Sequence, residues 1–302
     1  MQKTEFRIEQ TEKQIRDTEQ LKKELHQDQT VLKMLKARNI PERYLDLSPW
    51  KIDDWRQQFE PCVSCKGLSS CQQNQKGYYQ ALTYDGILKT ELQPCKYERE
   101  MQQKEKHLDN YLVSDLPKEL KTVSLATVLT DNEDKEYLYV LEEAIKASAA
   151  DQGLYIYGTL GSGKTYLAAC ACNDHARKGE KVAFVHYPTF TMRMENRIKG
   201  NEYKEELNRL MYASFLVIDD IGAESVTEFS RDTILLPLLN HRFEEGLATW
   251  FTSNCDMTSL QEHFTFAAKS REDSLKAERI MDRIRHMAKE TALTGENRRK
   301  AL

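Results

Sequence analysis

The stretch Gly158-Thr159-Leu160-Gly161-Ser162-Gly163-Lys164-Thr165 matches the pattern G-x-x-x-x-G-K-[ST] at every fixed position. A short apolar run, Leu154-Tyr155-Ile156-Tyr157, precedes it and predicts a buried strand, and residues 166–172 predict a helix after it. The glycines let successive backbone N–H groups face one concavity, at the partly positive N-terminus of that helix. The stretch therefore predicts a phosphate-binding loop between a strand and a helix.

The residue types of this loop predict how a nucleotide would be held. Lys164 is expected to reach the β- and γ-phosphates of ATP, and Thr165 is expected to hold Mg²⁺ through its hydroxyl. The expected nucleotide-binding residues are Gly158, Gly161, Ser162, Gly163, Lys164, Thr165 and Tyr166. The alternative is a chance match in a glycine-bearing loop, which the flanking strand and helix make less favourable.

Two carboxylates follow a second apolar run, Phe215-Leu216-Val217-Ile218-Asp219-Asp220. At the carboxyl end of a parallel strand, Asp219 is expected to bind Mg²⁺, and Asp220 to orient and deprotonate the attacking water. Asn254 ends a later predicted strand and is expected to hydrogen-bond the γ-phosphate or that water. A pair of loop acids is common by itself, but beside the glycine loop it predicts the second half of a hydrolytic site.

Helix and strand patterns alternate from residue 151 onward, which predicts a parallel sheet with helices on both faces. The chain has 302 residues, enough for two domains. We expect an α/β P-loop domain over residues 121–302, a linker over residues 106–120, and a small, mainly helical domain over residues 1–105. Residues 1–38 predict a helix with a narrow apolar stripe, broken near residues 26–28.

Four of the seven cysteines lie in the first third of the chain, namely Cys62, Cys65, Cys71 and Cys95. The C-x-x-C spacing of Cys62 and Cys65 is typical of a metal knuckle, and four thiolates suit tetrahedral Zn²⁺. Turn signals and β-formers between Cys65 and Cys95 predict a ribbon-like zinc module. The alternative is a redox dithiol, which would need Cys62 and Cys65 at a helix start within a thioredoxin-like pattern.

Composition limits the partners of the chain. No apolar run approaches the roughly 20 residues that a membrane span needs, and the polar N-terminus does not resemble a signal peptide. We therefore expect a cytoplasmic protein without a membrane partner. The net charge of −4 at pH 7 means that any contact with DNA must come from a local basic patch.

Residues 276–286 predict a basic helix in which Arg279 and Arg283 share one face. An arginine supplied by a neighbouring subunit would stabilise charge on the γ-phosphate, whereas the alternative is a solvated basic face. The C-terminal residues 296–300 are also basic, and would either fold back on the nucleotide or be disordered.

Four motifs in order, residues 158–165, 218–224, 252–254 and 278–283, resemble bacterial replicative-helicase loaders of the DnaI/DnaC type, which are AAA+ ATPases. The resemblance covers about residues 120–302, and the cysteine-bearing front third is similar to the DnaI branch. It implies an AAA+ domain that hydrolyses ATP at subunit interfaces. It also implies an N-terminal zinc domain that binds the hexameric replicative DNA helicase.

The same resemblance implies residue roles. The Walker B acids, the sensor-1 residue and the arginine finger would be Asp219 with Asp220, Asn254 and Arg283. Arg279 is the second choice for the arginine finger, and Arg298 or Arg299 resembles the sensor-2 position. The second Walker B acid is often Glu in AAA+ sites; the shorter Asp220 matches the loaders and is compatible with slow turnover.

A contact with single-stranded DNA inside the ring is a further implication of the resemblance. The segment 189–199 suits it, with Phe190 to stack on bases and Arg193 and Lys199 to bind phosphates. An ordinary amphipathic helix over the sheet explains the segment equally well.

Together these features predict a helicase loader that uses ATP, Mg²⁺ and Zn²⁺ during primosome assembly. A transposition helper ATPase has a similar AAA+ core and is one alternative. A binding adaptor that uses ATP as a structural switch without hydrolysing it is the other.

Overall fold

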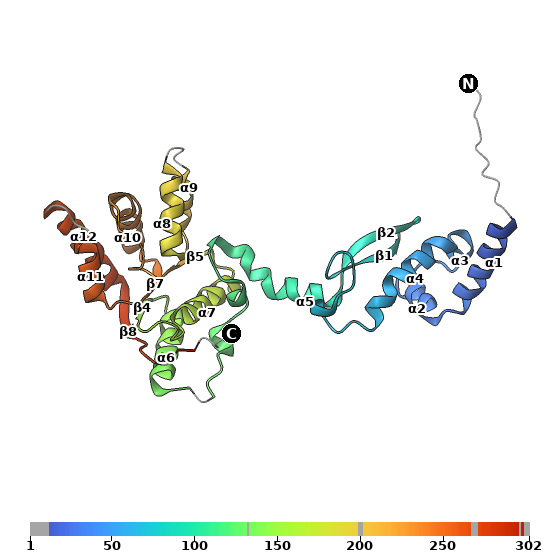
Figure 1. Cartoon of the computed structure of the whole chain (residues 1–302), viewed down its shortest axis with the longest axis horizontal. Coiled ribbons are helices and arrows are strands. Elements are labelled where there is room, and N and C mark those ends of the chain that lie inside the picture. Colours follow the sequence, from blue (N-terminus) through green and yellow to red (C-terminus); the bar gives the residue numbers. More distant parts are fainter. Residues whose placement is uncertain (1–11, 132, 199–201, 267–270, 296, 299–302) are drawn as a thin grey trace, which may run out of the picture. The chain divides into compact units, whose positions relative to one another are not determined.

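The computed structural model of the chain describes residues 12–131, 133–198, 202–266, 271–295 and 297–298 (Figure 1). The chain divides into two compact units, Met1–Gln103 and Lys104–Leu302. Within the described ranges, no helix combines the length and the apolar character that crossing a bilayer requires.

The second unit is built on a parallel sheet, as the alternation of helix and strand predicted. Its described strands follow the order β3-β5-β6-β7-β4-β8, and every neighbouring pair is parallel. The strands are β3 (Tyr111–Ser114), β4 (Gly153–Tyr157), β5 (Val182–His186), β6 (Phe215–Asp219), β7 (Ala248–Ser253) and β8 (Ala288–Ala292). All of them therefore end at the same edge of the sheet.

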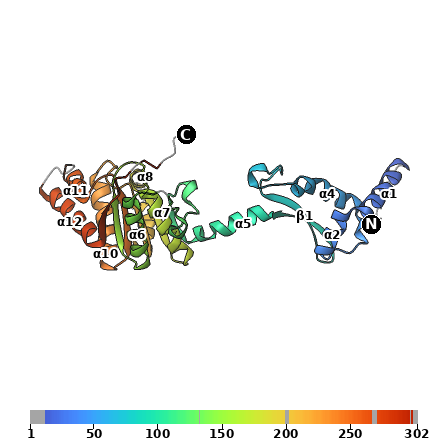
Figure 2. The ribbon, with the colours of Figure 1, turned by 90° about the horizontal axis from the view of Figure 1, so that it is seen from below.

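Helices cover both faces of this sheet (Figures 1 and 2). One face packs on α6 (Lys135–Ala149) and α7 (Lys164–Arg177). The other packs on α8 (Tyr187–Asn196), α9 (Tyr203–Met211), a π-helical stretch η6 (Phe229–Leu235), α10 (Leu236–Glu244), α11 (Met257–Phe266) and α12 (Arg271–Met287). Alternation along β6 shows the two layers, because Phe215 and Val217 pack toward α7 while Leu216 and Ile218 pack on the opposite side.

The segment 106–120, predicted as a linker, is instead folded into the second unit. Residues Lys106–Asn110 form the turn η2, and β3 follows it as an edge strand paired with β5. His107 is buried, with Nε2 3.2 Å from Oδ1 of Asn173 on α7. The prediction was wrong because β3 is only four residues long and is flanked by charged residues that obscure its apolar pattern.

The first unit is mainly helical and carries one hairpin. Its elements are α1 (Glu12–Gln27), α2 (Gln29–Ala37), α3 (Tyr44–Leu47), α4 (Pro49–Val63), the turn η1 (Leu68–Ser70), β1 (Tyr78–Tyr84), β2 (Leu88–Pro94) and most of α5 (Lys96–Glu105). The carboxylate of Asp28 accepts hydrogen bonds from the backbone N–H groups of Thr30 and Val31. This cap separates α1 from α2, so the predicted break near residues 26–28 is confirmed.

Phe190 does not have the exposed face that base stacking would need. It is 0% exposed and lies in the core between α8 and the sheet, with Tyr187 and Met194 at helical spacing on the same face. The stacking role predicted for Phe190 was therefore wrong, and the amphipathic-helix interpretation describes this residue correctly.

We predict that Phe190→Ala lowers the free energy of unfolding of the second unit by about 3–5 kcal/mol, because a large buried side chain would be removed. Met192→Ala is the matched control, since Met192 lies on the same helix with 65% of its surface exposed. Its effect should stay within about 0.5 kcal/mol. Urea denaturation, monitored by the hydrogen exchange of peptides from α8 to α12, measures the free energy of unfolding of both variants. Equal losses for the two variants would contradict the burial of Phe190.

Candidate nucleotide-binding site

The phosphate-binding loop, residues 158–165, connects β4 to α7, which begins at Lys164. Gly158, Gly161 and Gly163 adopt φ values of +146°, +81° and +107°, which disfavour side chains. A Cβ at Gly158 would lie 2.0 Å from the carbonyl oxygen of Leu293, and one at Gly161 would lie 2.0 Å from Oδ1 of Asn297. The glycines are therefore needed because the C-terminal segment crosses the loop in direct contact.

Lys164 is held inside this loop. Its side chain is nearly buried, and Nζ donates hydrogen bonds to the carbonyl oxygens of Gly158 at 2.9 Å and Thr159 at 2.8 Å. Nζ also donates to Oδ1 of Asn254 at 3.1 Å. Asn254 directly follows β7, so the structure brings together two residues that the sequence analysis assigned to one site.

Asp219 is the last residue of β6 and is buried. Its Oδ1 accepts a hydrogen bond from the hydroxyl of Thr252 at 2.6 Å, and the hydroxyl of Thr165 also hydrogen-bonds this carboxylate. Burial raises the pKa of Asp219, and the two hydroxyl hydrogen bonds partly oppose that increase. Thr165 and Asp219 thus lie next to each other, as a shared Mg²⁺ ion would require.

Asp220 has an unusual backbone conformation, with φ at +59°. Its N–H donates to Oγ1 of Thr252 at 2.9 Å, and Nδ2 of Asn254 donates to its Oδ1 at 3.0 Å. Nε2 of His186 lies 3.8 Å from its other carboxylate oxygen. A non-glycine residue held in a left-handed backbone conformation by several partners is typical of functional sites.

Thr252 and His186 were missed as site residues by the sequence analysis. Thr252 lies two residues before Asn254, so both side chains face the same side at the end of the strand. This two-residue alternation is the sequence signal that could have identified Thr252 as a site residue. His186 ends β5, which pairs with β6 in a register that places His186 opposite Asp219. Because strand order cannot be read from spacing alone, nothing in the sequence indicated that neighbour.

These groups line a cavity of about 730 Å³, a volume within the range of roughly 300–1,000 Å³ common for small-molecule sites. Its described lining includes the polar residues Lys164, Thr165, His186, Asp219, Asp220, Thr252, Asn254 and Arg298. Leu120, Val128, Leu129 and Tyr137 form an apolar wall. Polar groups that converge at one end of an apolar cavity suit a ligand with a charged end and a flat apolar end.

The residues that line the cavity fit a nucleoside triphosphate with Mg²⁺. The hydroxyl of Ser162, in the loop itself, is fully buried and has no hydrogen-bond partner among the described residues, which is uncommon for a buried polar group. Ser162 is not among the residues that line the cavity. Lys164 would supply positive charge, and the hydroxyl of Thr165 and the carboxylate of Asp219 are oxygen ligands of the kind that Mg²⁺ prefers.

Arg298 lies on the outer side of the loop. Its Nε donates to the carbonyl oxygen of Ser162 at 3.0 Å, and its guanidinium forms ion pairs with Glu133 and, at 2.8 Å, with Asp134. The guanidinium also lies 3.9 Å from the ring centroid of Tyr137. Arg298 therefore fastens the C-terminal segment to the loop while lining the cavity. Arg299, the other sensor-2 candidate, lies outside the described residues.

The arginine-finger candidates lie on α12, apart from this cavity. Nε of Arg283 donates to Oδ1 of Asn240 at 3.1 Å, and its guanidinium lies 4.7 Å from the ring centroid of Phe243 on α10. Arg279 is exposed. Of the described residues, Arg298 is the one arginine that lines the cavity, and neither Arg279 nor Arg283 is among the lining residues.

Of the two basic residues proposed for DNA, the structure describes Arg193, which is held in ion pairs. Arg193 forms ion pairs with Asp115 at 3.1 Å and with Glu206 at 2.8 Å. Lys199 lies outside the described residues. Because two carboxylates already neutralise Arg193, its attraction for a phosphate backbone is reduced.

The four cysteines of the first unit lie near one another, but not as a closed site. Cys62 is in the last turn of α4, where Nε2 of Gln73 donates to its sulfur at 3.2 Å. Burial raises the pKa of Cys62, and the neighbouring Cys71, Cys65 and Cys95 add to that increase. Within the described residues, no three of these sulfurs lie within 4.8 Å of one another.

The position of Cys62 bears on the redox alternative. A redox dithiol needs its reactive thiol at a helix N-terminus, where the helix dipole favours a thiolate. Cys62 lies instead at the C-terminal end of α4, and Cys65 follows that helix. The structure therefore argues against the redox interpretation.

The family described as IstB-like ATP binding protein matches residues 68–301. The chain belongs to this family. It is 29% identical to the replicative helicase loader DnaI of Bacillus subtilis (strain 168) over 290 residues, which cover 93% of each chain. It is 26% identical over 148 residues to the insertion sequence IS21 putative ATP-binding protein of Pseudomonas aeruginosa, covering 49% of this chain and 52% of that one.

A solved structure agrees with the fold. The crystal structure of DnaI superimposes with a TM-score of 0.55 at 31% sequence identity, and the match covers 62% of this chain and 98% of that one. The second unit therefore has the α/β fold of AAA+ proteins, and its family is one of ATP-binding proteins. Membership of an ATP-binding family agrees with the cavity, which the phosphate-binding loop and the buried Asp219 both line.

We predict that Lys164→Ala weakens ATP binding by about 10- to 150-fold, because a hydrogen bond to a charged group contributes about 1.5–3 kcal/mol. Lys178→Ala is the control, since Lys178 lies at the other end of α7 and is exposed. Equilibrium titration with a fluorescent ATP analogue measures both variants. An unchanged affinity in Lys164→Ala would contradict the assignment of this cavity to ATP.

Proposed function

We propose that this protein is a helicase loader. The first unit binds the hexameric replicative DNA helicase, and the second unit uses ATP and single-stranded DNA to place it during primosome assembly. The observation that carries this proposal is the similarity to DnaI, which runs over 93% of both chains and so includes both units. Similarity to the IS21 protein covers only about half of either chain, which is the reason for ranking a transposition helper second.

ATP hydrolysis in the second unit follows from the arrangement of the cavity. Lys164 would exchange its carbonyl contacts for the β- and γ-phosphates. Asp220, held by Asn254 and Thr252, would orient the attacking water and accept its proton. A bound Mg²⁺ would neutralise charge on the phosphates. The shorter reach of Asp220, compared with Glu, supports slow turnover.

Self-association of the second unit completes the proposed site. Arg298 is committed to Glu133 and Asp134, and Lys164 acts from within the loop. We assign the remaining cation to Arg283 of a neighbouring subunit, with Arg279 as the second choice. A heterologous contact of this kind builds a ring or an open helical assembly.

Zinc binding by the first unit is part of the same proposal. The donor set of Cys62, Cys65, Cys71 and Cys95 suits Zn²⁺, and the segment between them has little core of its own. A closed tetrahedral site places its sulfurs about 4 Å apart, since each Zn–S bond is about 2.3 Å long. Zinc binding would therefore draw the loop between α4 and β1 inward.

Single-stranded DNA is a proposed partner of the second unit, without Phe190. We assign it to the exposed side of α8, where Met192 is 65% exposed. The adaptor alternative has the same partners and differs only in lacking turnover.

We predict that Asp220→Ala and Arg283→Ala are each inactive as ATPases but recover activity when mixed. In a mixture, some interfaces pair an intact Asp220 with an intact Arg283 from the other variant. At equal amounts about one interface in four would do so, giving roughly a quarter of wild-type turnover. Phosphate release in the presence of single-stranded DNA measures this.

Arg285→Ala is the control for that experiment, because Arg285 lies on the same helix and hydrogen-bonds Gln261. It should keep turnover near the wild-type level. Absence of recovery in the mixture would contradict an arginine supplied in trans. Turnover that survives in Asp220→Ala would contradict the role of this acid.

We predict that the Cys62→Ser/Cys65→Ser double variant loses bound zinc and loses the replicative helicase of the same organism in co-purification, because the ion would hold the helicase-binding unit in shape. ATP binding, which belongs to the other unit, should be unchanged. Cys255→Ser is the control, since Cys255 lies outside the four-cysteine group. Metal analysis and co-purification measure the outcome. A zinc-free wild type would end the zinc proposal, and capture of a transposase instead of the helicase would favour the helper ATPase.

A further inference from the structure

A cluster of possible metal ligands lies at the opposite edge of the sheet from the phosphate-binding loop. Asp151 lies just before β4, Glu180 just before β5, and His175 near the end of α7. Nδ1 of His175 is 2.8 Å from Oε2 of Glu180 and 3.8 Å from Oδ1 of Asp151. One ligand atom from each residue lies within 4.8 Å of the other two. We call these three residues the amino-edge cluster.

The imidazole of this cluster is fixed in position. His175 is fully buried, and its ring stacks on Phe215 with a centroid separation of 4.0 Å and an interplanar angle of 14°. Its Nε2 lies 3.1 Å from Oγ of Ser148 on α6. Histidines that bind metals almost always have an outer partner on the second ring nitrogen, which sets the tautomer and orients the other nitrogen. Ser148 has this position here.

The cluster also gathers negative charge. Two carboxylates face one ring nitrogen, and among the described ion pairs neither Asp151 nor Glu180 has a lysine or arginine partner. When Nε2 donates its hydrogen to Ser148, the lone pair of Nδ1 faces a carboxylate oxygen at 2.8 Å, and that contact is repulsive unless a cation lies there. A divalent ion would balance both carboxylates, whereas a proton on Nδ1 would balance one.

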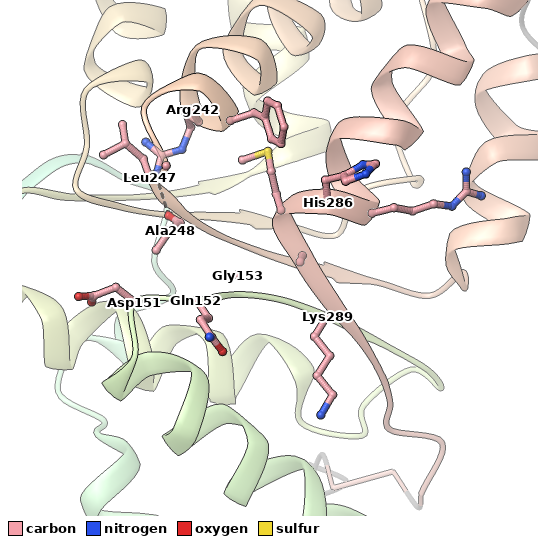
Figure 3. Close-up of a pocket in the computed structure, with 13 residues that line it drawn as sticks. Asp151, Gln152, Gly153, Arg242, Leu247, Ala248, His286 and Lys289 are labelled. Carbon is pink, nitrogen blue, oxygen red and sulfur yellow. Dashed lines mark hydrogen bonds between the residues drawn. The ribbon is translucent and has the colours of Figure 1, made fainter.

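Solvent reaches the cluster from the side of Asp151. The side chain of Asp151 is 73% exposed, and this residue lines a cavity of about 530 Å³ at the same edge of the sheet. Figure 3 shows Asp151 and Lys289 on opposite sides of this cavity. The side chain of Lys289 does not point toward Asp151. Arg242, which also lines the cavity, donates its hydrogen bonds to backbone carbonyls and Thr249.

We propose that the amino-edge cluster binds one divalent transition-metal ion. Nδ1 of His175 and the carboxylates of Asp151 and Glu180 are its protein ligands, and water completes the coordination. One imidazole with two carboxylates suits Zn²⁺, Co²⁺ or Mn²⁺. The ion ties the loop between α6 and β4 to the loop between α7 and β5, so it is a structural site separate from the nucleotide cavity.

Cobalt is the probe, because this chain has other groups that bind metals. Co²⁺ bound to the four cysteines gives sulfur-to-cobalt charge-transfer absorption, whereas Co²⁺ bound by nitrogen and oxygen does not. The full-length, nucleotide-free protein is loaded in excess Mg²⁺, which competes for Asp219 and Thr165. Total cobalt is then compared with the cobalt that the thiolate absorption accounts for.

The wild type should hold one cobalt ion more than its thiolate absorption reports. The Asp151→Asn/Glu180→Gln double variant should lose that ion with the thiolate absorption unchanged. Ser148→Ala should weaken its affinity about 10- to 100-fold, as loss of an outer partner does. Glu142→Gln is the matched control, because Glu142 is an acid on α6 that pairs with Lys146 outside the cluster, and it should retain the ion.

Equal cobalt contents in the wild type and the double variant would overturn the proposal and leave a hydrogen-bonded imidazole only. Circular dichroism checks that the variants fold. Should the double variant fail to fold, Asp151→Asn alone gives the same comparison, since its exposed carboxylate can be replaced without disturbing the core. Retention of the ion at wild-type affinity in that variant would also count against the site.

Discussion

The parallel pairing of β5, β6, β7 and β4 is the constraint on which the nucleotide site depends. In this register His186 lies opposite Asp219, and Tyr157 lies opposite Ser253. The residues that directly follow these strands are therefore neighbours, although they are far apart in the chain. No side chain has to reach across the sheet, because the backbone hydrogen bonds already bring the glycine loop, the acids and Asn254 to one edge. A slip of one residue in β6 would turn Asp219 to the other face.

In the sheet of the second unit, the strands predicted from sequence were the mostly buried central ones, and this explains which strands were missed. β6 reads Phe-Leu-Val-Ile-Asp, and all its residues are buried, so its apolar run was visible. β8 reads Ala-Lys-Glu-Thr-Ala and its charged residues are exposed, because it is an edge strand. β3, the other edge strand, reads Tyr-Leu-Val-Ser, is only four residues long and has no fully buried residue. The centre of the fold was therefore predictable and its edges were not.

Within the nucleotide site, residues in contiguous motifs could be predicted from the sequence, whereas contacts between segments far apart in the chain could not. The loop and the two acids lie in contiguous motifs, so their roles could be assigned from residue type and position. The partners Thr252 and His186, and the ion pairs of Arg298 with Glu133 and Asp134, depend on packing between segments that no local pattern connects. Phe190 shows the converse error, since an aromatic residue shortly before Arg193 predicted a DNA contact although its helical spacing also fits a core position.

Charge in the cavity argues that one subunit cannot complete the proposed site alone. The described lining carries four carboxylates, Glu119, Glu133, Asp219 and Asp220, and two permanent cations, Lys164 and Arg298. Arg298 is already paired with Glu133 and Asp134, which leaves Lys164 against the buried Asp219 and the exposed side of Asp220. A triphosphate adds further negative charge, so in the proposed function Mg²⁺ would accompany it and a cation from outside this cavity would assist its hydrolysis. Under the proposed function, the nucleotide would then report the presence of a neighbouring subunit.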